Sequence, residues 1–408
     1  MHKALPCTRG TPESTPPRAA SVVILHLVVW FWSLVVPALI LTACSLATER
    51  GRARYVLRRL AEEPKDLPPA SVIVPVKGED EGLRENLAAL ASLDYPDYEL
   101  LIAAHSANDI PPGVLPPRAK VVLAHGADPV TGEKIQNLMA AVHATRKPSK
   151  ILAFADSDGC VRRGWLRALT APLAEEGTGA ATGYRWFLPE PANFWSVLRA
   201  VWDAVPAGML SAGDNRFAWG GAMAIRKDTF FEAGVPTYWT GAISDDYALS
   251  VAVRSAGLKI AYSPGALVPS REHISARDLW HWMRRQMMIT RFYDSRQWWP
   301  GLVAHFFYCG AMAASIAAGC QGHRLGWWTL AAQLGPGMFK GAHRAALARA
   351  ALPEYAGWFR RYGWSHVVGV PLATWLWLAA LLSSAFGSTI EWRGHRYNLQ
   401  NRGWDKRV

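Results

Sequence analysis

Cysteine is scarce in this chain of 408 residues, which contains only Cys7, Cys44, Cys160, Cys309 and Cys320. Their spacing matches no zinc-binding pattern and no paired framework of the kind that holds small secreted domains together. A disulfide scaffold and a cysteine-ligated metal centre are therefore excluded. Unpaired, scattered thiols are typical of a reducing compartment.

The chain also lacks the two glycine-rich signatures that bind phosphate groups. No Gly-x-Gly-x-x-Gly follows its first predicted strand, and no Walker-type loop with a lysine occurs. These absences argue against a standard dinucleotide-binding domain and against a P-loop. A phosphorylated ligand would have to be held by other groups, such as carboxylates that bind a metal ion.

Negative charge is in the minority, with 32 acidic residues against 44 Lys and Arg and a net charge of +12. Nucleic-acid binding would need basic residues interleaved with aromatics in a recognisable module, and we find no such module. The basic residues instead gather beside apolar segments, as Arg50, Arg52, Arg54, Arg58 and Arg59 do. This positive-inside pattern predicts a bacterial inner-membrane protein whose central domain faces the cytoplasm, near anionic lipids.

Apolar residues are plentiful, at 50% of the chain with 20 tryptophans, which indicates contact with a bilayer. Residues 21–47 form a nearly uncharged run that is long enough to span a membrane. Farther on, residues 302–320 and 327–339 form a plausible pair of spans. Residues 367–386 are also long enough, but spanning would carry the basic tail outside, so the positive-inside rule favours a re-entrant or interfacial segment.

The first apolar run ends in Leu41-Thr42-Ala43-Cys44, which resembles a lipoprotein processing site. The run is longer than the apolar part of a usual signal peptide, and the basic cluster follows it rather than precedes it. We therefore expect a signal anchor and not a lipidated Cys44.

Between the apolar zones, strand patterns alternate with helical ones, which predicts an α/β domain with a parallel sheet covered on both faces. The predicted strands are residues 71–76, 98–104, 120–123 and 151–155, and helical spacing covers 83–93 and 135–145. The expected organisation is a tail (1–20), a transmembrane anchor (21–47), a basic juxtamembrane linker (48–69), the α/β domain (70–275), an amphipathic interfacial helix (276–299), a membrane region (300–386) and a basic tail (387–408).

The strand at 151–155 ends abruptly in Asp156-Ser157-Asp158. In open α/β sheets, ligands bind at the edge formed by the carboxyl ends of the strands. Two acids on alternate residues repel each other unless a cation lies between them, and Mg²⁺ or Mn²⁺ holding a diphosphate suits this position. Taken alone, the motif is more often a solvated turn.

Three further patterns each have two readings. Trp219-Gly220-Gly221, inside a predicted glycine-broken strand at 218–225, is either a close backbone approach to a ligand or a β-bulge beside a core tryptophan. Ser244, Asp245 and Asp246 open a helix, where Ser244 or Asp245 is by default an N-cap, and alternatively one acid caps while the other is free to face a cleft. The basic, aromatic helix at 280–291 is either an interfacial helix or a source of arginines for a diphosphate leaving group.

The order of these patterns resembles the family 2/21 glycosyltransferases, most closely ceramide glucosyltransferases and their bacterial relatives linked to hopanoid biosynthesis. The motifs are Pro-Val-Lys-Gly (75–78), Lys-Ile-x-Asn-Leu (134–138), Asp-Ser-Asp (156–158), Thr-Gly-Tyr-Arg-Trp (182–186), Trp-Gly-Gly (219–221), Asp-Asp-Tyr (245–247) and the arginine-rich helix. The match covers about residues 71–291, and the tail at 390–397 also looks like the family's C-terminus.

The resemblance implies a GT-A fold, a UDP-sugar donor, a divalent metal ion and inversion at the anomeric carbon. It assigns nucleotide-sugar contacts to Pro75, Val76, Lys77, Gly78, Lys134, Asn137 and Asp156. It assigns the metal ion to Asp156 and Asp158, and the general base to Asp246. Trp219, Gly220, Gly221, Asp245, Arg284 and Arg285 are expected on the acceptor and diphosphate side.

These roles suit the chemistry. Expulsion of a nucleoside diphosphate requires a divalent ion and cationic side chains, and an inverting step requires one carboxylate to deprotonate the acceptor hydroxyl.

Two positions depart from the family pattern. Ser106 stands where an acid is usual after the second strand, with Asp109 three residues later as a possible substitute. In the family's Gln/Arg-x-x-Arg-Trp motif, Arg285 keeps the arginine while Trp282 and Gln286 replace its neighbours. An impaired member or one of altered specificity is therefore one reading.

The sequence predicts a membrane-bound enzyme that transfers a hexose, glucose first, from a UDP-sugar to a lipid hydroxyl. Ceramide leads among the acceptors, with a hopanoid or diacylglycerol as alternatives. A processive polysaccharide synthase would need more spans and an intact Gln-x-x-Arg-Trp. The alternative outside the enzymes is a non-catalytic membrane protein that has the same fold and binds a lipid or a nucleotide.

Overall fold

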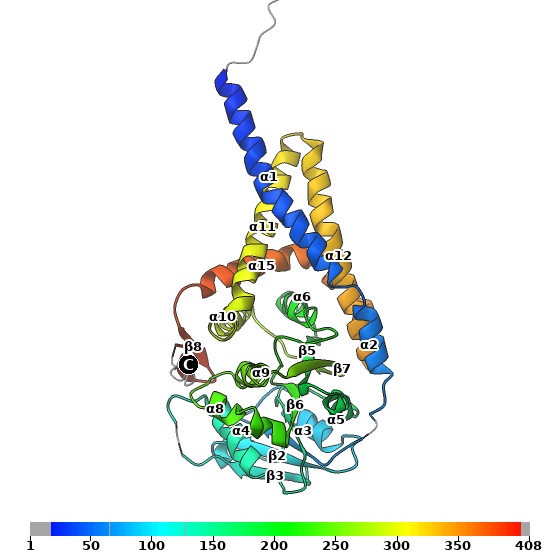
Figure 1. Ribbon diagram of the computed structural model, residues 1–408, viewed down its shortest axis with the longest axis vertical. Coiled ribbons are helices and arrows are strands. Elements are labelled where there is room, and N and C mark those ends of the chain that lie inside the picture. Colours follow the sequence, from blue (N-terminus) through cyan, green and yellow to red (C-terminus); the bar gives the residue numbers. More distant parts are fainter. Residues whose placement is uncertain (1–17, 65, 127, 401–408) are drawn as a thin grey trace, which may run out of the picture.

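The computed structural model describes residues 18–64, 66–126 and 128–400. Figure 1 shows an α/β domain from which long helices rise on one side. The expected N-terminal tail lies outside the described residues up to position 17, as does the end of the basic tail from position 401.

A single seven-stranded sheet forms the centre of the domain, in the order β3-β2-β1-β4-β6-β5-β7. Its strands are β1 (Ala70–Pro75), β2 (Tyr98–Ala104), β3 (Ala119–Leu123), β4 (Ile151–Ala155), β5 (Thr178–Phe187), β6 (Ala222–Arg226) and β7 (Lys259–Ser270). The first four are parallel, as predicted from their apolar runs.

The expectation of a wholly parallel sheet is wrong at β6, which runs antiparallel to both β4 and β5. The chain leaves β5 at the carboxyl edge of the sheet and passes through α6 (Phe194–Ala207). It then re-enters from that same edge, so the next strand must run in reverse.

Helices cover both faces of the sheet because alternate residues of each strand point to opposite sides. Val72 and Val74 pack with α3 (Leu83–Ala91) and α5 (Trp165–Thr170). Ile73 packs on the other side, with α4 (Glu133–His143) and α9 (Asp245–Ser255). The short helices α7 (Lys227–Glu232) and α8 (Val235–Trp239) extend this second layer. The α/β class is thereby confirmed.

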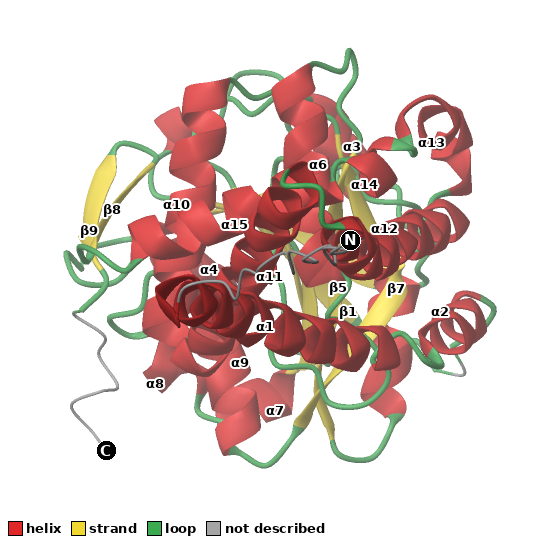
Figure 2. Cartoon of the chain, turned by 90° about the horizontal axis from the view of Figure 1, so that it is seen from above, coloured by secondary structure: helices red, strands yellow, loops and turns green. Residues whose placement is uncertain are grey.

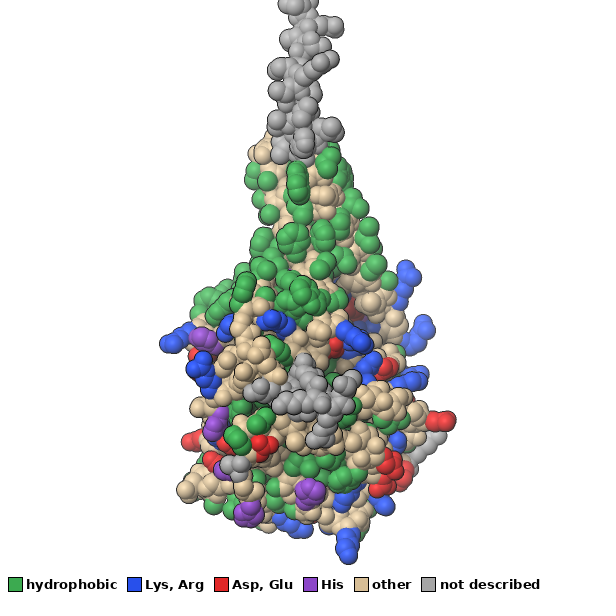
Figure 3. Space-filling view, turned by 60° about the vertical axis from the view of Figure 1, so that its left-hand side comes forward, with side chains coloured by type: hydrophobic (Ala, Val, Ile, Leu, Met, Phe, Trp, Pro, Cys, Tyr) green, Lys and Arg blue, Asp and Glu red, His purple; other side chains and the backbone are tan. Residues whose placement is uncertain are grey.

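Three long helices, which we call the stalk, stand away from the sheet: α1 (Arg18–Ala47), α11 (Ser295–Cys320) and α12 (Arg324–Ala351). On the face shown in Figure 3, apolar side chains cover the described part of the stalk, and Lys and Arg side chains lie at the level of the domain below it. By length and composition, Val28–Leu60 and Ser295–Cys320 suffice to cross a membrane.

Below the stalk, α10 (Ala276–Tyr293) and α15 (Val370–Ser384) lie across the domain beside α6, with α13 (Ala356–Tyr362) and α14 (Ser365–Val368) nearby. Figure 2 shows these helices as a layer above the strands. Unlike α1 and α11, α15 runs sideways at the base of the stalk in Figure 1 and packs against α10, α11 and α6.

Two segments differ from the expected linker and tail. The juxtamembrane segment contains α2 (Arg52–Leu60), which is docked on the domain because the Tyr55 hydroxyl donates to the Tyr262 carbonyl at 2.6 Å. After α15, the chain forms a hairpin of β8 (Thr389–Trp392) and β9 (His395–Asn398), which returns to the domain instead of trailing free.

Candidate active site

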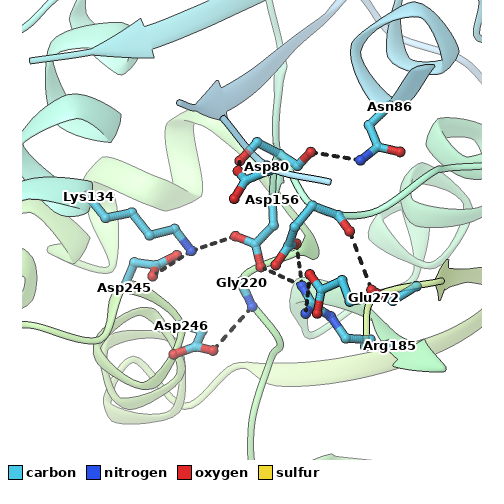
Figure 4. Close-up of polar contacts among 12 residues, drawn as sticks. Asp80, Asn86, Lys134, Asp156, Arg185, Gly220, Asp245, Asp246 and Glu272 are labelled. Atoms are coloured by element: carbon cyan, nitrogen blue, oxygen red, sulfur yellow. Dashed lines mark hydrogen bonds and ion pairs between the residues drawn. The ribbon is translucent and has the colours of Figure 1, made fainter. Parts of the chain in front are cut away.

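A cavity of about 480 Å³, called the first cavity below, opens at the carboxyl edge of β1 and β4. Side chains from β1, α4, β5, α6, α9, α10 and the β8–β9 hairpin line it. This is the edge at which α/β sheets bind ligands. Figure 4 shows the charged groups that meet there.

Asp156 and Asp158 follow β4 and are held by two cations. Lys134 Nζ donates to Asp156 Oδ1 at 2.8 Å and lies 3.0 Å from Asp245 Oδ1. Arg185 donates to Asp158 and lies 3.5 Å from Asp156 Oδ2. Burial disfavours the charge on Lys134, but these carboxylates keep its pKa above the ordinary value.

The two acids at the start of α9 have different surroundings. Asp245 is only 2% exposed, and burial raises its pKa to about 6 despite the ion pair with Lys134. Asp246 is half-buried and lines the first cavity. Its carboxylate accepts hydrogen bonds from the amides of Gly220 at 3.2 Å and Tyr247 at 2.7 Å, and from the Ser244 hydroxyl. Two backbone amides and the Ser244 hydroxyl thus orient Asp246, while Asp245 is held in an ion pair with Lys134.

The two glycines allow the backbone to approach these acids closely. A Cβ atom at Gly220 would lie 2.7 Å from Asp245 Oδ2, and one at Gly221 would lie 2.8 Å from Asp156 Oδ2. Residues 218–221 precede β6, so the predicted glycine-broken strand is a turn followed by a shorter strand. Both readings keep support, because carboxylates lie close to the two glycines and a Cβ at Gly221 would also overlap the Trp219 ring.

Three arginines from distant segments surround the same space and are called the guanidinium cluster: Arg185, Arg285 and Arg393. Burial, followed by the charges of Arg393 and Arg185, lowers the pKa of Arg285. Among the described residues, no carboxylate forms an ion pair with Arg285. Arg393 donates to the Lys77 carbonyl at 2.9 Å and to Asp80 Oδ1 at 2.7 Å. Arg185 and Arg393 each have a carboxylate partner, so Arg285 is the member of the cluster that is suited to an anionic ligand.

The same space also suits a divalent cation. Arg185, which donates to Asp158, lies 3.9 Å from Glu272 Oε1, and burial together with the charge of Asp158 raises the pKa of Glu272 to about 7. In the described part of the chain, no three ligating side chains form a ready metal cage. Mg²⁺ commonly uses one or two carboxylates and completes its shell with substrate phosphates and water, so Asp156 and Asp158 fit such an ion.

The structure brings most of the predicted residues together in the first cavity. Those that line it are Pro75, Val76, Lys77, Lys134, Asn137, Asp156, Asp158, Trp219, Gly220, Asp245, Asp246 and Arg285. Lys77 Nζ is bound to Glu133 and to His395, each at 2.7 Å.

Three predicted residues lie outside the cavity lining. Gly78 forms a turn at φ 69° and donates its amide hydrogen to the Asp109 carbonyl. Gly221 lies behind Trp219 and Asp156. Arg284 points to the other side of α10 and donates to the Phe386 carbonyl at 3.2 Å. These three residues do not line the cavity in this structure, and their contacts with a ligand stay predictions.

The two departures from the family motif have different outcomes. Ser106 and Asp109 cap a short 3₁₀ helix reciprocally, and neither lines the cavity, so Asp109 does not replace the missing acid. Trp282, Arg285 and Gln286 share one face of α10 and all line the cavity.

Several cavity residues were not singled out from the sequence: Asp80, Tyr184, Arg185, Arg199, Asp203, Glu272, Trp392, Arg393, His395 and Tyr397. Arg185 and the hairpin residues lie within motifs that carry the family resemblance, which was the available signal. Glu272 directly follows the carboxyl end of β7, where the edge rule applies as it does to Asp156.

Comparison with known proteins gives one family. The model of glycosyl transferase family 21 matches residues 30–405. Ceramide glucosyltransferase 3 of Caenorhabditis elegans is 23% identical over 235 residues, which cover 55% of this chain and 50% of that protein. Ceramide glucosyltransferase 1 of the same organism is 25% identical over 221 residues, covering 51% and 47%. The chain spans about half the length of the curated relatives it matches.

Solved structures with a similar fold are more distant. The mannosyltransferase PcManGT from Pyrobaculum calidifontis, in complex with GDP-Man and Mn²⁺, is 18% identical with a TM-score of 0.44, covering 86% of this chain and 97% of that one. GalNAc-T7 with UDP, GalNAc and Mn²⁺ is 15% identical with a TM-score of 0.38, covering 52% and 45%. Likenesses this weak place no residue of the site.

Proposed function

Because the chain belongs to glycosyl transferase family 21, we propose that it transfers a hexose from a UDP-sugar to the hydroxyl group of a membrane lipid. The main support for this proposal is the set of side chains that line the first cavity. It holds Asp156 and Asp158, the guanidinium cluster and the half-buried Asp246 in one space beneath the stalk. Glucose and ceramide are the first substrates to test, because the curated relatives are ceramide glucosyltransferases.

The donor side is built for a diphosphate. When bound to Asp156 and Asp158, Mg²⁺ or Mn²⁺ would neutralise the charge that develops on the leaving nucleoside diphosphate. The guanidinium cluster supplies further positive charge to the same group. Lys134 keeps Asp156 in place through its 2.8 Å hydrogen bond, and Arg185 does the same for Asp158.

Asp246 is the proposed general base. Its carboxylate belongs to α9, on a different segment from Asp158, so the acceptor hydroxyl and the leaving group can lie on opposite sides of the sugar. The Tyr247 amide and the Ser244 hydroxyl donate to Oδ1 of this carboxylate and fix its orientation, while Oδ2 accepts only from the Gly220 amide and keeps a lone pair free to accept a proton. A base in this position removes the hydroxyl proton as the acceptor oxygen attacks the anomeric carbon.

We also propose that the stalk inserts into a membrane, with the α/β domain on the cytoplasmic side. The apolar surface of α1, α11 and α12 supports this placement, as do the basic side chains at the base of the stalk (Figure 3). The sideways position of α15 supports an interfacial role for it. A lipid head group would then reach the first cavity from the membrane surface.

The test uses the purified full chain with Mg²⁺ or Mn²⁺, UDP-glucose and ceramide in detergent. We expect glucosylceramide from the natural chain and a loss of turnover of about 10²- to 10⁴-fold in Asp246→Asn, with UDP affinity unchanged within about twofold. Asp228→Asn, which makes the same change at an exposed position on α7, should keep full activity. Undiminished turnover of Asp246→Asn would exclude its role as the base.

The acceptor panel also includes a hopanoid and diacylglycerol. Turnover with one of these lipids, but not with ceramide, would identify a different acceptor and would still support the proposed glycosyl transfer. Absence of turnover with every UDP-hexose and lipid, together with retained UDP binding, would instead support the non-catalytic binding protein.

A further inference from the structure

A second cavity, of about 510 Å³, lies between α1, α6, α11, α12 and α15, where the stalk meets the domain. None of the residues assigned to the proposed reaction lines it. Its size is in the range of ligand-binding cavities and far exceeds a packing defect that holds one water molecule.

Several polar atoms at this cavity are buried without a hydrogen-bond partner. They are Gln333 Oε1, Arg344 Nε and His366 Nε2, each on a side chain that lines the cavity. Burying an unpaired polar group costs free energy, and native proteins usually provide such a group with a partner. The Arg344 Nε–H is a donor that suits an anionic group, whereas the acceptor Gln333 Oε1 suits a donor such as a hydroxyl group, so together they indicate a polar ligand.

Positive charge exceeds negative charge around this cavity. Glu49 is shared between Arg52 at 3.8 Å, Lys340 at 4.0 Å and His343 at 2.8 Å. Arg344 forms no ion pair with any carboxylate in the described residues, and its Nη1 reaches only the Ala204 carbonyl at 3.4 Å. Glu49 favours the charge of Arg344 but is shared with Arg52, Lys340 and His343, so an anion in the cavity would complete the charge balance.

The rest of the lining combines apolar side chains with hydroxyl groups, such as those of Thr42, Ser45 and Thr374. Met312, Leu334, Val370, Ala373 and Trp377 line the cavity together with Lys340 and Arg344. These residues come from α11, α12 and α15, which belong to the stalk and its base. A free inorganic anion would leave this surface without a partner, whereas an amphiphile with an anionic head would contact both parts.

This space is separate from the first cavity because α6 lies between them. Arg199 and Asp203 face the first cavity, while Val201, Ala204 and Val205 face the second. Aromatic rings also separate the two cavities. Trp377 stacks on the buried Trp202, with ring centroids 4.1 Å apart. Trp202 in turn contacts Trp282, which lines the first cavity.

We propose that the second cavity binds an anionic glycerophospholipid, with its phosphate at Arg344 and Lys340 and its acyl chains along the apolar lining. The occupant is a resident lipid and not the glycosyl acceptor, since α6 and the tryptophans block passage to Asp246. The inference rests on the proposed membrane placement of the stalk but not on the proposed reaction.

The test titrates the delipidated full chain in detergent and reads bound lipid by native mass spectrometry. The probes are dioleoyl phosphatidylglycerol, dioleoylglycerol and glycerol 3-phosphate. We expect the first to bind stoichiometrically, and Arg344→Gln to weaken binding at least about tenfold. Lys340→Gln should weaken it as well, so the idea stays testable if Arg344→Gln fails to fold. Arg349→Gln, exposed on the same helix, is the matched control and should bind like the natural chain.

Three results would overturn the proposal. Unchanged affinity in both Arg344→Gln and Lys340→Gln would remove the phosphate contact. Equal binding of dioleoylglycerol would show that the charge is irrelevant. Glycerol 3-phosphate binding as tightly as the lipid would show a site for a free anion. Each readout is independent of glycosyl transfer, so failure of one proposal leaves the other standing.

Discussion

Lys134 connects three parts of the site that are far apart in the sequence. Its ammonium group contacts Asp156 after β4 and Asp245 at the start of α9, and a Cβ at Gly220 would lie 3.1 Å from it. One side chain thus joins Asp156 to the start of α9, where the proposed base Asp246 follows Asp245. Charge balance explains why so many acids coexist here: Lys134 and Arg185 offset the repulsion among them.

The proposed metal contact of Asp158 leads to a prediction about donor binding. We expect Asp158→Ala to weaken UDP binding in the presence of Mn²⁺, because the carboxylate that holds the ion is lost. EDTA should lower the affinity of the natural chain to that of the variant and change the variant little. Isothermal titration calorimetry measures both. Equal UDP affinity with and without EDTA in both proteins would contradict the assignment.

Asp203 on α6 leads to a prediction about stability and pH. Burial raises its pKa to about 7, opposed by the charge of Arg185, the Tyr184 hydroxyl and the charge of Arg199. The ordinary aspartate pKa is about 4, so between about pH 4 and pH 7 the folded chain keeps a proton that the unfolded chain has released. The stability contribution of this group is therefore full below pH 4 and declines as the pH rises to 7.

Asp203→Asn removes that decline, because an amide cannot ionise and can still accept the hydrogen bond from Tyr184. We expect the variant to have the higher thermal midpoint above pH 7 and a flatter profile between pH 5 and 7.5. The effect scales as about 1.4 kcal/mol per unit of pKa shift. Midpoints of the detergent-purified proteins across this range provide the check, and parallel profiles would show that Asp203 does not titrate this way.

At the scale of elements, the β8–β9 hairpin joins the end of the chain to the first strand. Arg393, at its turn, contacts the carbonyl of Lys77 and the carboxylate of Asp80, and His395 contacts Lys77 and Glu133. Trp392 and Tyr397 line the first cavity from the same hairpin. The hairpin is therefore one wall of the proposed donor site.

We predict that Arg393→Gln raises the KM for UDP-glucose about tenfold and changes kcat less, since a charged hydrogen bond is worth about 1.5–3 kcal/mol. Steady-state kinetics of the purified enzyme measure this. Arg396→Gln makes the same change at an exposed position on the same hairpin and serves as the control. Equal behaviour of the two variants would mean that the hairpin affects the site only through its overall charge.

The same elements show what the sequence alone could predict. The apolar runs of β1, β2 and β4 match the predicted strands within one residue at each end, because buried parallel strands are continuously apolar. The edge rule then placed Asp156 and Asp158 correctly relative to the cavity. The reversal of β6 was not predictable, since periodicity carries no strand direction.

The position of the β8–β9 hairpin beside the first cavity also could not be predicted from sequence patterns. Positive charge at Arg393 and Arg396 indicates a basic tail by composition, and nothing local shows that this segment folds back to Lys77, more than 300 residues earlier. Gly78 and Arg284 lie outside the cavity lining for a related reason. A motif predicts which residues lie near a site. Whether a given residue faces the cavity depends on its backbone φ angle or on the face of the helix that carries it.

For the whole molecule, the arrangement of stalk, base and domain determines which lipid groups can reach which site. The first cavity lies at the carboxyl edge of the sheet, and the second lies above it, at the base of the stalk. Because α6 and the Trp202–Trp377 stack separate them, a lipid resident in the second cavity would restrain α6, which carries Arg199 and Asp203 into the first. The roles proposed for both cavities require that the stalk is inserted in the membrane with the α/β domain on the cytoplasmic side.

That direction is testable with cysteine chemistry. The turn between α11 and α12 lies at the end of the stalk far from the domain, and Cys320 there is exposed (Figure 1). In otherwise cysteine-free chains, we expect Cys320 to react with a membrane-impermeant maleimide on intact spheroplasts. Asp228→Cys, on the exposed face of α7, should react only after permeabilisation. Labelling of both positions on the same side before permeabilisation would mean that α11 and α12 do not cross, because a helical hairpin that spans the bilayer must carry its turn to the side opposite the domain.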